Sequence, residues 1–313
     1  MKIALVHKAQ FPVRGYGGTE RVVWWLAKGL HELGCDVTLV CRRGSYCPFA
    51  KVHFSEDLPG ADILHFFETP FREPVHPYVV TIEGNGKRGE TFLKNTIFVS
   101  KNHAMRHGST SFVYNGLDPD EYLFAEAKSG YLIFLAKASW KVKNVKGAIS
   151  LARRSRTPLH ILGGKKFLGN HRDGIRWEGM LDGKRKAALI AKASGLLFPV
   201  IWNEPFGIAI IEALVSGTPV LASPYGSLPE LVPDEVGKIC ATEEDFFVGI
   251  EKLPRFKPKV CRDWVLENFH YRKMAQKYMD SYQRVLSGES LNAHVPKAIE
   301  DPERLYSIAP RTG

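Results

Sequence analysis

Two glutamates lie eight positions apart in a segment whose other residues are almost all apolar or small. They are Glu204 and Glu212, within FPVIWNEPFGIAIIEALVSGTPVLAS at residues 198–223. Pro205 and Gly207 predict a turn around Glu204, and a helix follows that contains Glu212. A carboxylate accepts two hydrogen bonds readily, so each glutamate suits a ligand that carries hydroxyl groups. At the rise of an α-helix the two are about 12 Å apart, which suits a ligand longer than a monosaccharide.

The predicted helix at 207–216 begins where an anion or a polyol would bind. It follows the apolar run GLLFPV, which predicts a strand, and Gly217 ends it. Helix N-termini present unpaired backbone N–H groups and a positive dipole end, so the amides from Phe206 onward suit a phosphate or sugar hydroxyls. An interaction with this dipole explains Glu204 equally well. A solvated helix face explains Glu212 poorly, because apolar residues flank it on both sides.

Glycines and lysines mark two further candidate phosphate sites. GYGGTE at 15–20 stands between the first predicted strand and helix, where Gly17 and Gly18 let the backbone approach a diphosphate or an acceptor closely. The same glycines also fit a purely geometric turn. A dinucleotide fingerprint needs its third glycine at the position of Glu20, so the spacing argues against an NADP-dependent oxidoreductase. LAKASWKVKNVKG at 135–147 places several lysines beside another predicted strand end.

Short apolar runs alternate with helix-length segments along most of the chain. This alternation predicts βαβ units and parallel sheets. The turn-rich NGLDPDEY at 115–122 separates two such series. We therefore expect an α/β protein of two Rossmann-like, doubly wound parallel-sheet domains facing a central cleft. The expected ranges are 1–122, joined by a C-terminal helix at 268–287, then 123–267, and a loosely held tail at 288–313.

The composition is that of an ordinary soluble globular protein. It is 44% hydrophobic and 24% charged, and no run approaches the roughly 18 apolar residues that span a bilayer. The five cysteines are scattered, which favours neither a disulfide framework nor a zinc site and suits a reducing cytoplasm. The net charge is +10, and residues 121–200 hold 16 basic and 5 acidic residues. Such a block is usually a solvated face, but it also suits anionic lipid or a phosphorylated substrate. No motif indicates nucleic-acid binding.

Several of these segments occur together in one known family. EPFGIAIIEALVSGTPVLAS followed by GSLPELV resembles the donor-binding signature of retaining glycosyltransferases of family 4 (GT4), which have the GT-B fold and two glutamates separated by seven residues. YGGTERVV at 16–23, YNGLDPDEY and LFPVIWNEPFG extend the resemblance, and together they look most like the branch that includes the avilamycin-type glycosyltransferases. The resemblance covers most of residues 1–285.

The resemblance implies roles in binding a nucleotide-sugar donor. Glu204 would accept hydrogen bonds from the donor sugar, and Glu212 would bind the ribose hydroxyls. The backbone at Phe206, Gly207 and Ile208 would cradle the sugar and the diphosphate.

Two cations complete the implied donor site. Family members carry an arginine and then a lysine on the donor phosphates, after the first strand of the second domain. Here Lys137 takes the arginine position, and for the second cation we favour Lys143 over Lys141 or Lys146. A lysine supplies charge but not the planar fork of arginine.

The largest departure from the family pattern is Glu83, in VVTIEGNG at 79–86. Many relatives read TLHG here, and their histidine lies beside the donor sugar near the acceptor hydroxyl. Glu83 would bond a donor hydroxyl or attract an acceptor proton, or it caps the adjacent glycine turn. His65, Glu68 and His103 are further polar candidates near strand ends, for which structural roles are more common than catalytic ones.

The predicted reaction, implied by the resemblance, is transfer of a sugar from a nucleoside-diphosphate donor to an acceptor hydroxyl, with retention at the anomeric carbon. Glu204 and Glu83 are the candidate catalytic residues. Lys137, Lys143 and the helix N-terminus would stabilise the leaving diphosphate, and a leaving phosphate oxygen would take the acceptor's proton. We expect neither a metal nor another cofactor, because no cluster of aspartates offers a metal site and the family uses protein cations.

The expected acceptor is a carbohydrate, a lipid-linked molecule or a small molecule, in polysaccharide, lipopolysaccharide or glycolipid synthesis. The expected location is the cytoplasm, with peripheral contact at the inner membrane face. The alternative is a nucleotide-sugar-binding module without transfer activity, which is suggested by Lys137, Glu83 and a chain shorter than most two-domain relatives.

Overall fold

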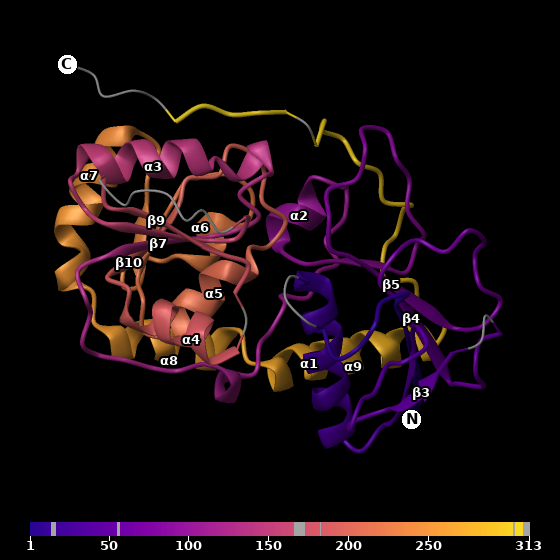
Figure 1. Ribbon diagram of the computed structural model, residues 1–313. Coiled ribbons are helices and arrows are strands. Elements are labelled where there is room, and N and C mark those ends of the chain that lie inside the picture. Colours follow the sequence, from indigo (N-terminus) through magenta and orange to yellow (C-terminus); the bar gives the residue numbers. More distant parts are fainter. Residues whose placement is uncertain (14–16, 55–56, 166–172, 182, 303, 309–313) are drawn as a thin grey trace. The chain divides into compact units, whose positions relative to one another are not determined.

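The chain divides into two compact units in the computed structural model (Figure 1). The model describes residues 1–13, 17–54, 57–165, 173–181, 183–302 and 304–308. The first unit comprises Met1–Asp118 with Phe269–Pro302, and the second comprises Pro119–Asn268 with Glu303–Gly313. Each unit is built around one six-stranded sheet with helices beside it. The predicted α/β fold with two parallel sheets is therefore confirmed.

All strands in the sheet of the first unit are parallel, in the order β3-β2-β1-β4-β5-β6. The winding direction changes between β1 and β4, since β2 and β3 extend the sheet on one side of β1 and the later strands extend it on the other. The strands are β1 Lys2–Val6, β2 Asp36–Val40, β3 Lys51–His53, β4 Ile63–Phe66, β5 Tyr78–Ile82 and β6 Thr96–Phe98. Ligands bind at such a switch point in doubly wound sheets, outside the carboxyl ends of the strands.

Two long helices of the first unit pack against each other. They are α1 Gly18–Glu32 and α9 Tyr271–Leu286, and a short α2 Lys101–Met105 follows β6. The apolar residues of α1 recur at helical spacing, and Val22, Val23 and Leu26 are fully buried. A Cβ added at Gly29 would lie 2.6 Å from the Cβ of Ala275, so glycine permits this close approach of the two helices.

The sheet of the second unit repeats this pattern, in the order β12-β11-β10-β7-β8-β9, and its switch point lies between β7 and β10. In Figure 1, α3 and α7 lie on one face of the sheet, and α4, α5 and α8 lie on the other. The strands are β7 Leu132–Leu135, β8 Leu159–Leu162, β9 Ile175–Gly179, β10 Gly195–Phe198, β11 Val220–Ala222 and β12 Gly237–Ile239. The helices are η1 Pro119–Glu121, η2 Lys141–Lys143, α3 Val145–Arg154, α4 Gly183–Lys192, α5 Ile208–Val215, α6 Leu228–Leu231, α7 Glu243–Lys252, η3 Leu253–Arg255 and α8 Pro258–Asn268.

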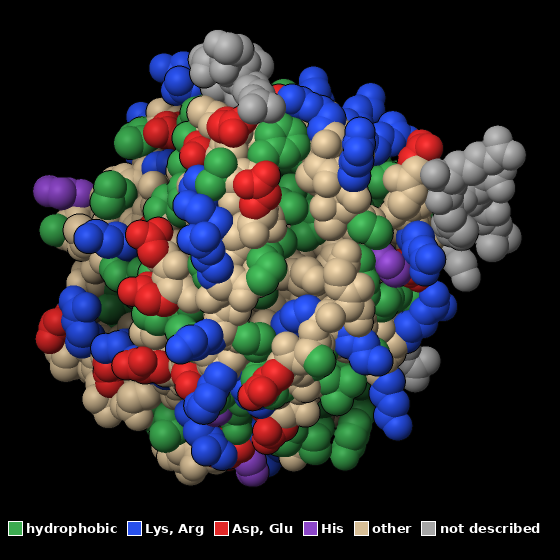
Figure 2. Space-filling model, turned by 90° about the vertical axis from the view of Figure 1, so that its left-hand side faces the viewer, with side chains coloured by type: hydrophobic (Ala, Val, Ile, Leu, Met, Phe, Trp, Pro, Cys, Tyr) green, Lys and Arg blue, Asp and Glu red, His purple; other side chains and the backbone are tan. Residues whose placement is uncertain are grey.

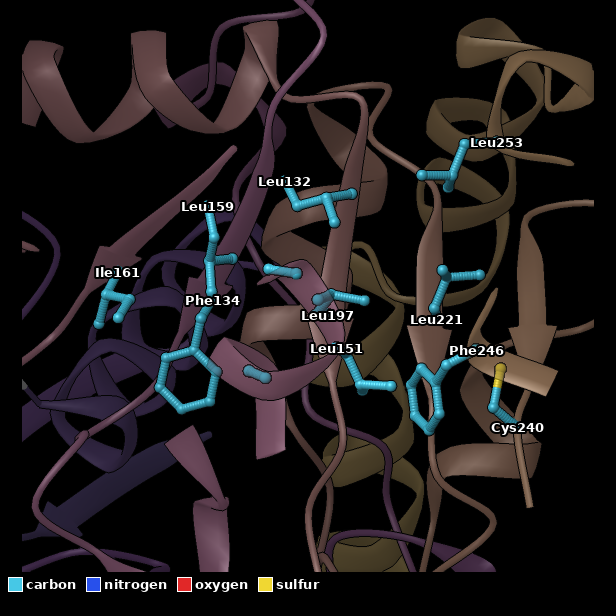
Figure 3. Close-up of a cluster of buried hydrophobic side chains, with 12 residues drawn as sticks. Leu132, Phe134, Leu151, Leu159, Ile161, Leu197, Leu221, Cys240, Phe246 and Leu253 are labelled. Carbon is cyan, nitrogen blue, oxygen red and sulfur yellow. The ribbon is translucent and has the colours of Figure 1, made fainter. Parts of the chain in front are cut away.

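A buried apolar cluster holds α3 and α7 against this sheet (Figure 3). Alternate residues of each strand point into the cluster, as Leu132 and Phe134 of β7 do. Leu151 of α3 and Phe246 of α7 reach it from the helices. The strands are buried on both faces, which explains why their sequences read as continuous apolar runs.

Beyond residue 263 the helices agree with the predicted pattern, and the chain after them differs from the loosely held tail that was expected. One or two helices were expected in WVLENFHYRKMAQKYMDSYQRVLSG, and the structure has two, α8 and α9, which belong to different units. The chain after α9 is divided as well. Leu291, Asn292 and Ala298 are buried in the first unit, and the backbone N–H of Tyr306 donates to the carbonyl of Ile201 in the second (2.8 Å).

In Figure 2, acidic side chains lie among lysine and arginine on the left and at the bottom of the view, and lysine and arginine adjoin one another at the upper right with few acidic side chains. Among the described residues, no helix is both long enough and apolar enough to span a membrane.

Candidate functional site

The segment that carries Glu204 lies at the switch point of the second sheet. It follows β10, while Lys137 and Lys143 follow the neighbouring β7. Glu204 forms an isolated parallel bridge with Gly226, and the backbone N–H of Ser227 donates to the Glu204 carbonyl (3.0 Å). The chain after β11 therefore fixes the backbone of Glu204.

The Glu204 carboxylate is buried and paired with Lys143. The Lys143 Nζ lies 2.7 Å from Oε1 and 2.6 Å from Oε2, and the indole N–H of Trp202 donates to Oε2 (2.7 Å). Glu204 is 6% exposed and Lys143 is 7% exposed. The Lys143 ammonium also lies over the rings of Phe198 and Trp202, at 5.6 and 4.8 Å from their centroids. Both charges thus have close partners, which offsets the desolvation that burial imposes.

The Glu212 carboxylate is held by two residues from outside α5. The Lys186 Nζ of α4 lies 2.8 Å from Oε1 and 3.0 Å from Oε2, and the hydroxyl of Tyr122 donates to Oε1 (2.8 Å). Glu212 is 4% exposed. These contacts hold a charged acceptor in one orientation along the helix.

The start of α5 lies between the two glutamates in the chain. Gly207 is its N-cap residue, with a φ of 96° that glycine adopts readily, and no side chain caps the helix. Phe206 and Gly207 are buried and Ile208 is partly exposed. Lys137 lies two residues after the end of β7, and its ammonium sits 4.9 Å from the centroid of the Trp140 ring. Lys141 and Lys146 are exposed. The structure therefore brings Lys143 rather than these two lysines to Glu204.

The predicted residues of the first unit lie at the carboxyl end of its sheet. Gly18 begins α1, and a Cβ added at Gly17 would lie 2.7 Å from the Glu20 carboxylate, so glycine leaves room for that side chain. The rest of the glycine loop, residues 14–16, lies outside the described residues. Glu83 directly follows β5 and accepts a hydrogen bond from the side-chain amide of Asn115 (2.8 Å).

Two of the other polar candidates have structural contacts. His65 is fully buried and bonds to the hydroxyls of Tyr282 (2.7 Å) and Thr81 (2.8 Å). Burial lowers the pKa of His65 to about 3, so the ring is neutral. His103 is also buried and bonds to the backbone carbonyl of Gly84 (3.0 Å). Burial lowers its pKa as well. The structural roles expected for these two histidines agree with these contacts.

Sequence reasoning missed four residues that contact the candidate ones: Tyr122, Lys186, Trp202 and Asn115. Trp202 stands two positions before Glu204, and this short separation in the sequence could have indicated a contact between the two side chains. Lys186 stands 26 positions from Glu212, on a helix whose other basic residues look similar in the sequence. Nothing local distinguishes it.

Gly226 supports a stability prediction. A Cβ added there would lie 2.3 Å from the backbone nitrogen and oxygen of Glu204, and its φ is +71°. We expect Gly226→Ala to lower the free energy of unfolding by about 2 to 4 kcal/mol, because both strain and a backbone clash oppose the new methyl group. Denaturant unfolding of the purified variant measures this.

Gly130→Ala is the matched control for this effect. Gly130 has a φ of +73°, but nothing lies within 4 Å of an added Cβ. Only the backbone strain applies, at about 1 kcal/mol. Equal destabilisation by the two substitutions would mean that the contact between Gly226 and Glu204 is unimportant.

Comparisons with known proteins agree with the fold. The family described as Glycosyl transferases group 1 matches residues 121–255. A phosphatidyl-myo-inositol mannosyltransferase of Mycobacterium leprae is 39% identical over 66 residues, which are 21% of this chain and 18% of that protein. The chain spans about a third or less of the length of the curated relatives it matches.

Solved structures show the same fold over almost the whole chain. AviGT4, a glycosyltransferase involved in avilamycin A biosynthesis, is similar with a TM-score of 0.79 and 23% identity, over 92% of this chain and 98% of that one. The Anabaena protein HepE, in complex with UDP-glucose, is similar with a TM-score of 0.66 and 14% identity, over 90% of this chain and 99% of that one. Residues 121–255 thus match glycosyl transferases group 1, and the chain has the GT-B fold of these solved structures.

Proposed function

We propose that the protein is a retaining glycosyltransferase that moves a sugar from a nucleoside-diphosphate-sugar to an acceptor hydroxyl. One arrangement in the second unit carries this proposal. A carboxylate paired with a cation comes first, a helix N-terminus follows, and a second carboxylate is held in place by a lysine. Glu204 and Lys143 supply the first pair, α5 begins four residues after Glu204, and Glu212 lies on the same helix. These groups match the sugar, the diphosphate and the ribose of one donor.

In the proposed complex the donor sugar lies at Glu204 and the diphosphate lies at Lys143, Lys137 and the amides of Gly207 and Ile208. In this proposal the Lys143 charge stands where the sugar joins the phosphate, and its direct contact with Glu204 supports that position. Glu212 receives the ribose hydroxyls, and Lys186 keeps its carboxylate in position.

The proposed transfer breaks the bond between the anomeric carbon and the phosphate oxygen. The bonding electrons leave with the nucleoside diphosphate, whose growing charge the lysines and the helix N-terminus stabilise. The acceptor oxygen forms the new bond on the same face, and its proton passes to the departing phosphate oxygen. The donor is a substrate, and no resident cofactor takes part in the proposal.

The proposed acceptor is a carbohydrate, a lipid-linked molecule or a small molecule. A contact with a membrane surface would involve the loop between β4 and β5, where Phe71 is 98% exposed and Val75 is fully exposed, with Arg72 between them. Exposed apolar side chains beside a cation suit an interfacial contact.

A nucleotide-sugar-binding module without transfer activity is the second candidate. Lys137 in place of the family arginine and Glu83 in place of the family histidine favour it. A thermal-shift panel of UDP-, GDP-, ADP- and dTDP-sugars identifies the donor, and mass spectrometry of the reaction with that donor follows. A donor-dependent product, or slow hydrolysis of the donor, supports the enzyme. Binding without either one supports the module.

The proposed role of Glu212 gives a kinetic prediction. We expect Glu212→Gln to raise the KM for the donor about ten- to a hundredfold with little change in kcat, because one charge-assisted hydrogen bond to the ribose is lost. Lys186→Met is expected to raise this KM to a smaller extent, because it frees the Glu212 carboxylate without removing it. Initial rates over a range of donor concentrations measure both.

Lys184→Met is the matched control for Lys186→Met. Both lysines are on α4, but Lys184 is exposed and Lys186 is only partly so. A donor KM that stays at the parental value in both Glu212→Gln and Lys186→Met would remove Glu212 from the ribose site.

A further inference from the structure

Three neighbouring strands of the first sheet end in titratable side chains. His7 directly follows β1, Glu68 comes two residues after β4, and Glu83 directly follows β5. Because β1, β4 and β5 are adjacent and parallel, their carboxyl ends lie along one edge, at the switch point of this sheet. Glu20, in the first turn of α1, is close enough to interact electrostatically with both His7 and Glu83.

Buried hydrogen-bond acceptors at this edge lack partners. Oε1 of Glu83 and Oδ1 of Asn115 are both shielded from solvent, and neither receives a hydrogen bond from any described residue. Asn115 is 1% exposed, and its amide nitrogen donates to the other oxygen of Glu83, so both unsatisfied oxygens belong to one hydrogen-bonded pair. Leaving buried polar atoms unsatisfied is costly, and such atoms in a native structure indicate a missing partner. Asn115 Oδ1, and Glu83 Oε1 when the carboxyl is ionised, can each accept a hydrogen bond from a bound group.

The glutamates at this edge also lack cationic partners among the described residues. Glu20, Glu68 and Glu83 form no ion pair with any residue in the part of the chain that the structure describes. Burial, with a contribution from the Glu20 charge, raises the pKa of the Glu83 carboxyl to about 7, although the Asn115 bond opposes this. The contrast with the second unit is direct, since a lysine is bound to each of its two glutamates, Glu204 and Glu212.

His7 adds no positive charge to the edge. Burial lowers the pKa of its ring, although the Glu20 and Glu68 charges oppose this. Both of its ring nitrogens lack hydrogen-bond partners among the described residues, and the ring meets Phe11 and Phe67 edge-on, with centroids 6.2 and 6.0 Å away. Phe11 and Phe67 are themselves buried, so these contacts fix the His7 ring beside the acidic groups.

A bound metal ion does not account for this arrangement. Across the described ranges, no three or more His, Cys, Asp or Glu side chains are grouped so that they could hold a metal ion. The partner must instead supply hydrogen-bond donors and positive charge over a wider area. A primary ammonium group has three N–H donors and no acceptor. Its bonds to carboxylates are charge-assisted.

We propose that this edge binds an acceptor that carries a protonated primary amine, such as an amino sugar, with the ammonium group at Glu83 and Asn115. Glu20 and Glu68 add negative charge around it. The protonated amine is not a nucleophile, so a hydroxyl of the same acceptor receives the transferred sugar. This inference rests on the proposed glycosyltransferase function and specifies its acceptor.

Matched acceptors test the proposal on the whole 313-residue chain. Binding of glucosamine, N-acetylglucosamine, glucose and glucose 6-phosphate is measured by ligand-observed NMR in the presence of the nucleoside diphosphate found by the donor panel. We expect glucosamine to bind about ten- to a hundredfold more tightly than N-acetylglucosamine, and the phosphate ester to bind most weakly. Equal binding of the amine and its acetylated form overturns the proposal.

Single substitutions test which residues produce the binding preference for the amine. Glu83→Gln is expected to abolish the preference for the amine, and Glu20→Gln, on a different element, to reduce it severalfold. Glu90→Gln changes an exposed carboxylate of the same unit and should leave the preference unchanged. A preference that persists in both the Glu83 and the Glu20 variant contradicts the proposed site.

Donor hydrolysis, measured on the same samples, separates this inference from the proposed function. Donor turnover without an amine preference contradicts the amine site alone. An amine preference without any donor turnover contradicts the transferase and leaves the binding site supported.

Discussion

Glu204→Gln is expected to lower kcat for sugar transfer by about a hundred- to a thousandfold, because groups preorganised around a transition state typically have effects of this size. Glutamine keeps the shape of the side chain but loses its charge and one accepting oxygen. The Lys143 ammonium then loses the carboxylate that fixes it 2.6 Å away, so both the sugar and the phosphate lose their orientation. Initial rates at saturating donor, with the donor found by the thermal-shift panel, measure the effect.

Glu251→Gln is the control for Glu204→Gln, because Glu251 is an exposed residue of α7 in the same unit. It should retain parental kinetics. Circular dichroism and the melting temperature of each variant show whether the second unit stays folded. A folded Glu204→Gln protein with a kcat within about threefold of the parent would remove Glu204 from the catalytic residues.

Lys143→Met is expected to lower the free energy of unfolding by about 3 to 5 kcal/mol and to abolish measurable transfer. The thermodynamic cost arises because Glu204 stays buried without its cation, which is far more costly than losing an exposed ion pair. The kinetic loss arises because the proposed phosphate site loses the cation nearest to the sugar. Denaturant unfolding and product formation measure the two effects separately.

Lys141→Met is the matched control for this prediction. Lys141 lies in the same short helical turn, η2, but is exposed, so its loss is expected to change stability by less than about 0.5 kcal/mol. The double variant Lys143→Met with Glu204→Gln should recover part of the lost stability without recovering activity, since it removes the unpaired charge. The buried ion pair would be unimportant if Lys143→Met were as stable as Lys141→Met.

The secondary structure was largely predictable from local patterns. Runs such as YLIFLA and LHILGG became β7 and β8, because a strand covered on both faces must be apolar along its whole length. The strands β3 and β12 were not predicted, because each is a short edge strand that is only partly buried and contains a lysine. A three-residue run is too short to show a periodicity.

The site was predictable only where one short segment contains it. Glu204, Phe206, Gly207, Ile208 and Glu212 lie within nine consecutive positions, and their order along a turn and a helix follows from the sequence. The lysine partner of Glu204 was not predictable in this way, because several lysines follow β7 and the sequence does not distinguish them. Burial and a bidentate contact distinguish Lys143 from its exposed neighbours, and both depend on the fold of the chain around it.

The sequence by itself determined the two α/β halves, the turn and helix that carry the paired glutamates, and the presence of Glu83 in place of a family histidine. Only the tertiary structure decided what each carboxylate contacts. Lysines from other segments are bound to Glu204 and Glu212, whereas an amide 32 positions away binds Glu83 and leaves one oxygen of each partner unsatisfied. The physical reason is that periodicity encodes which residues face a core, whereas the partner of a polar group depends on strand order and packing between distant segments.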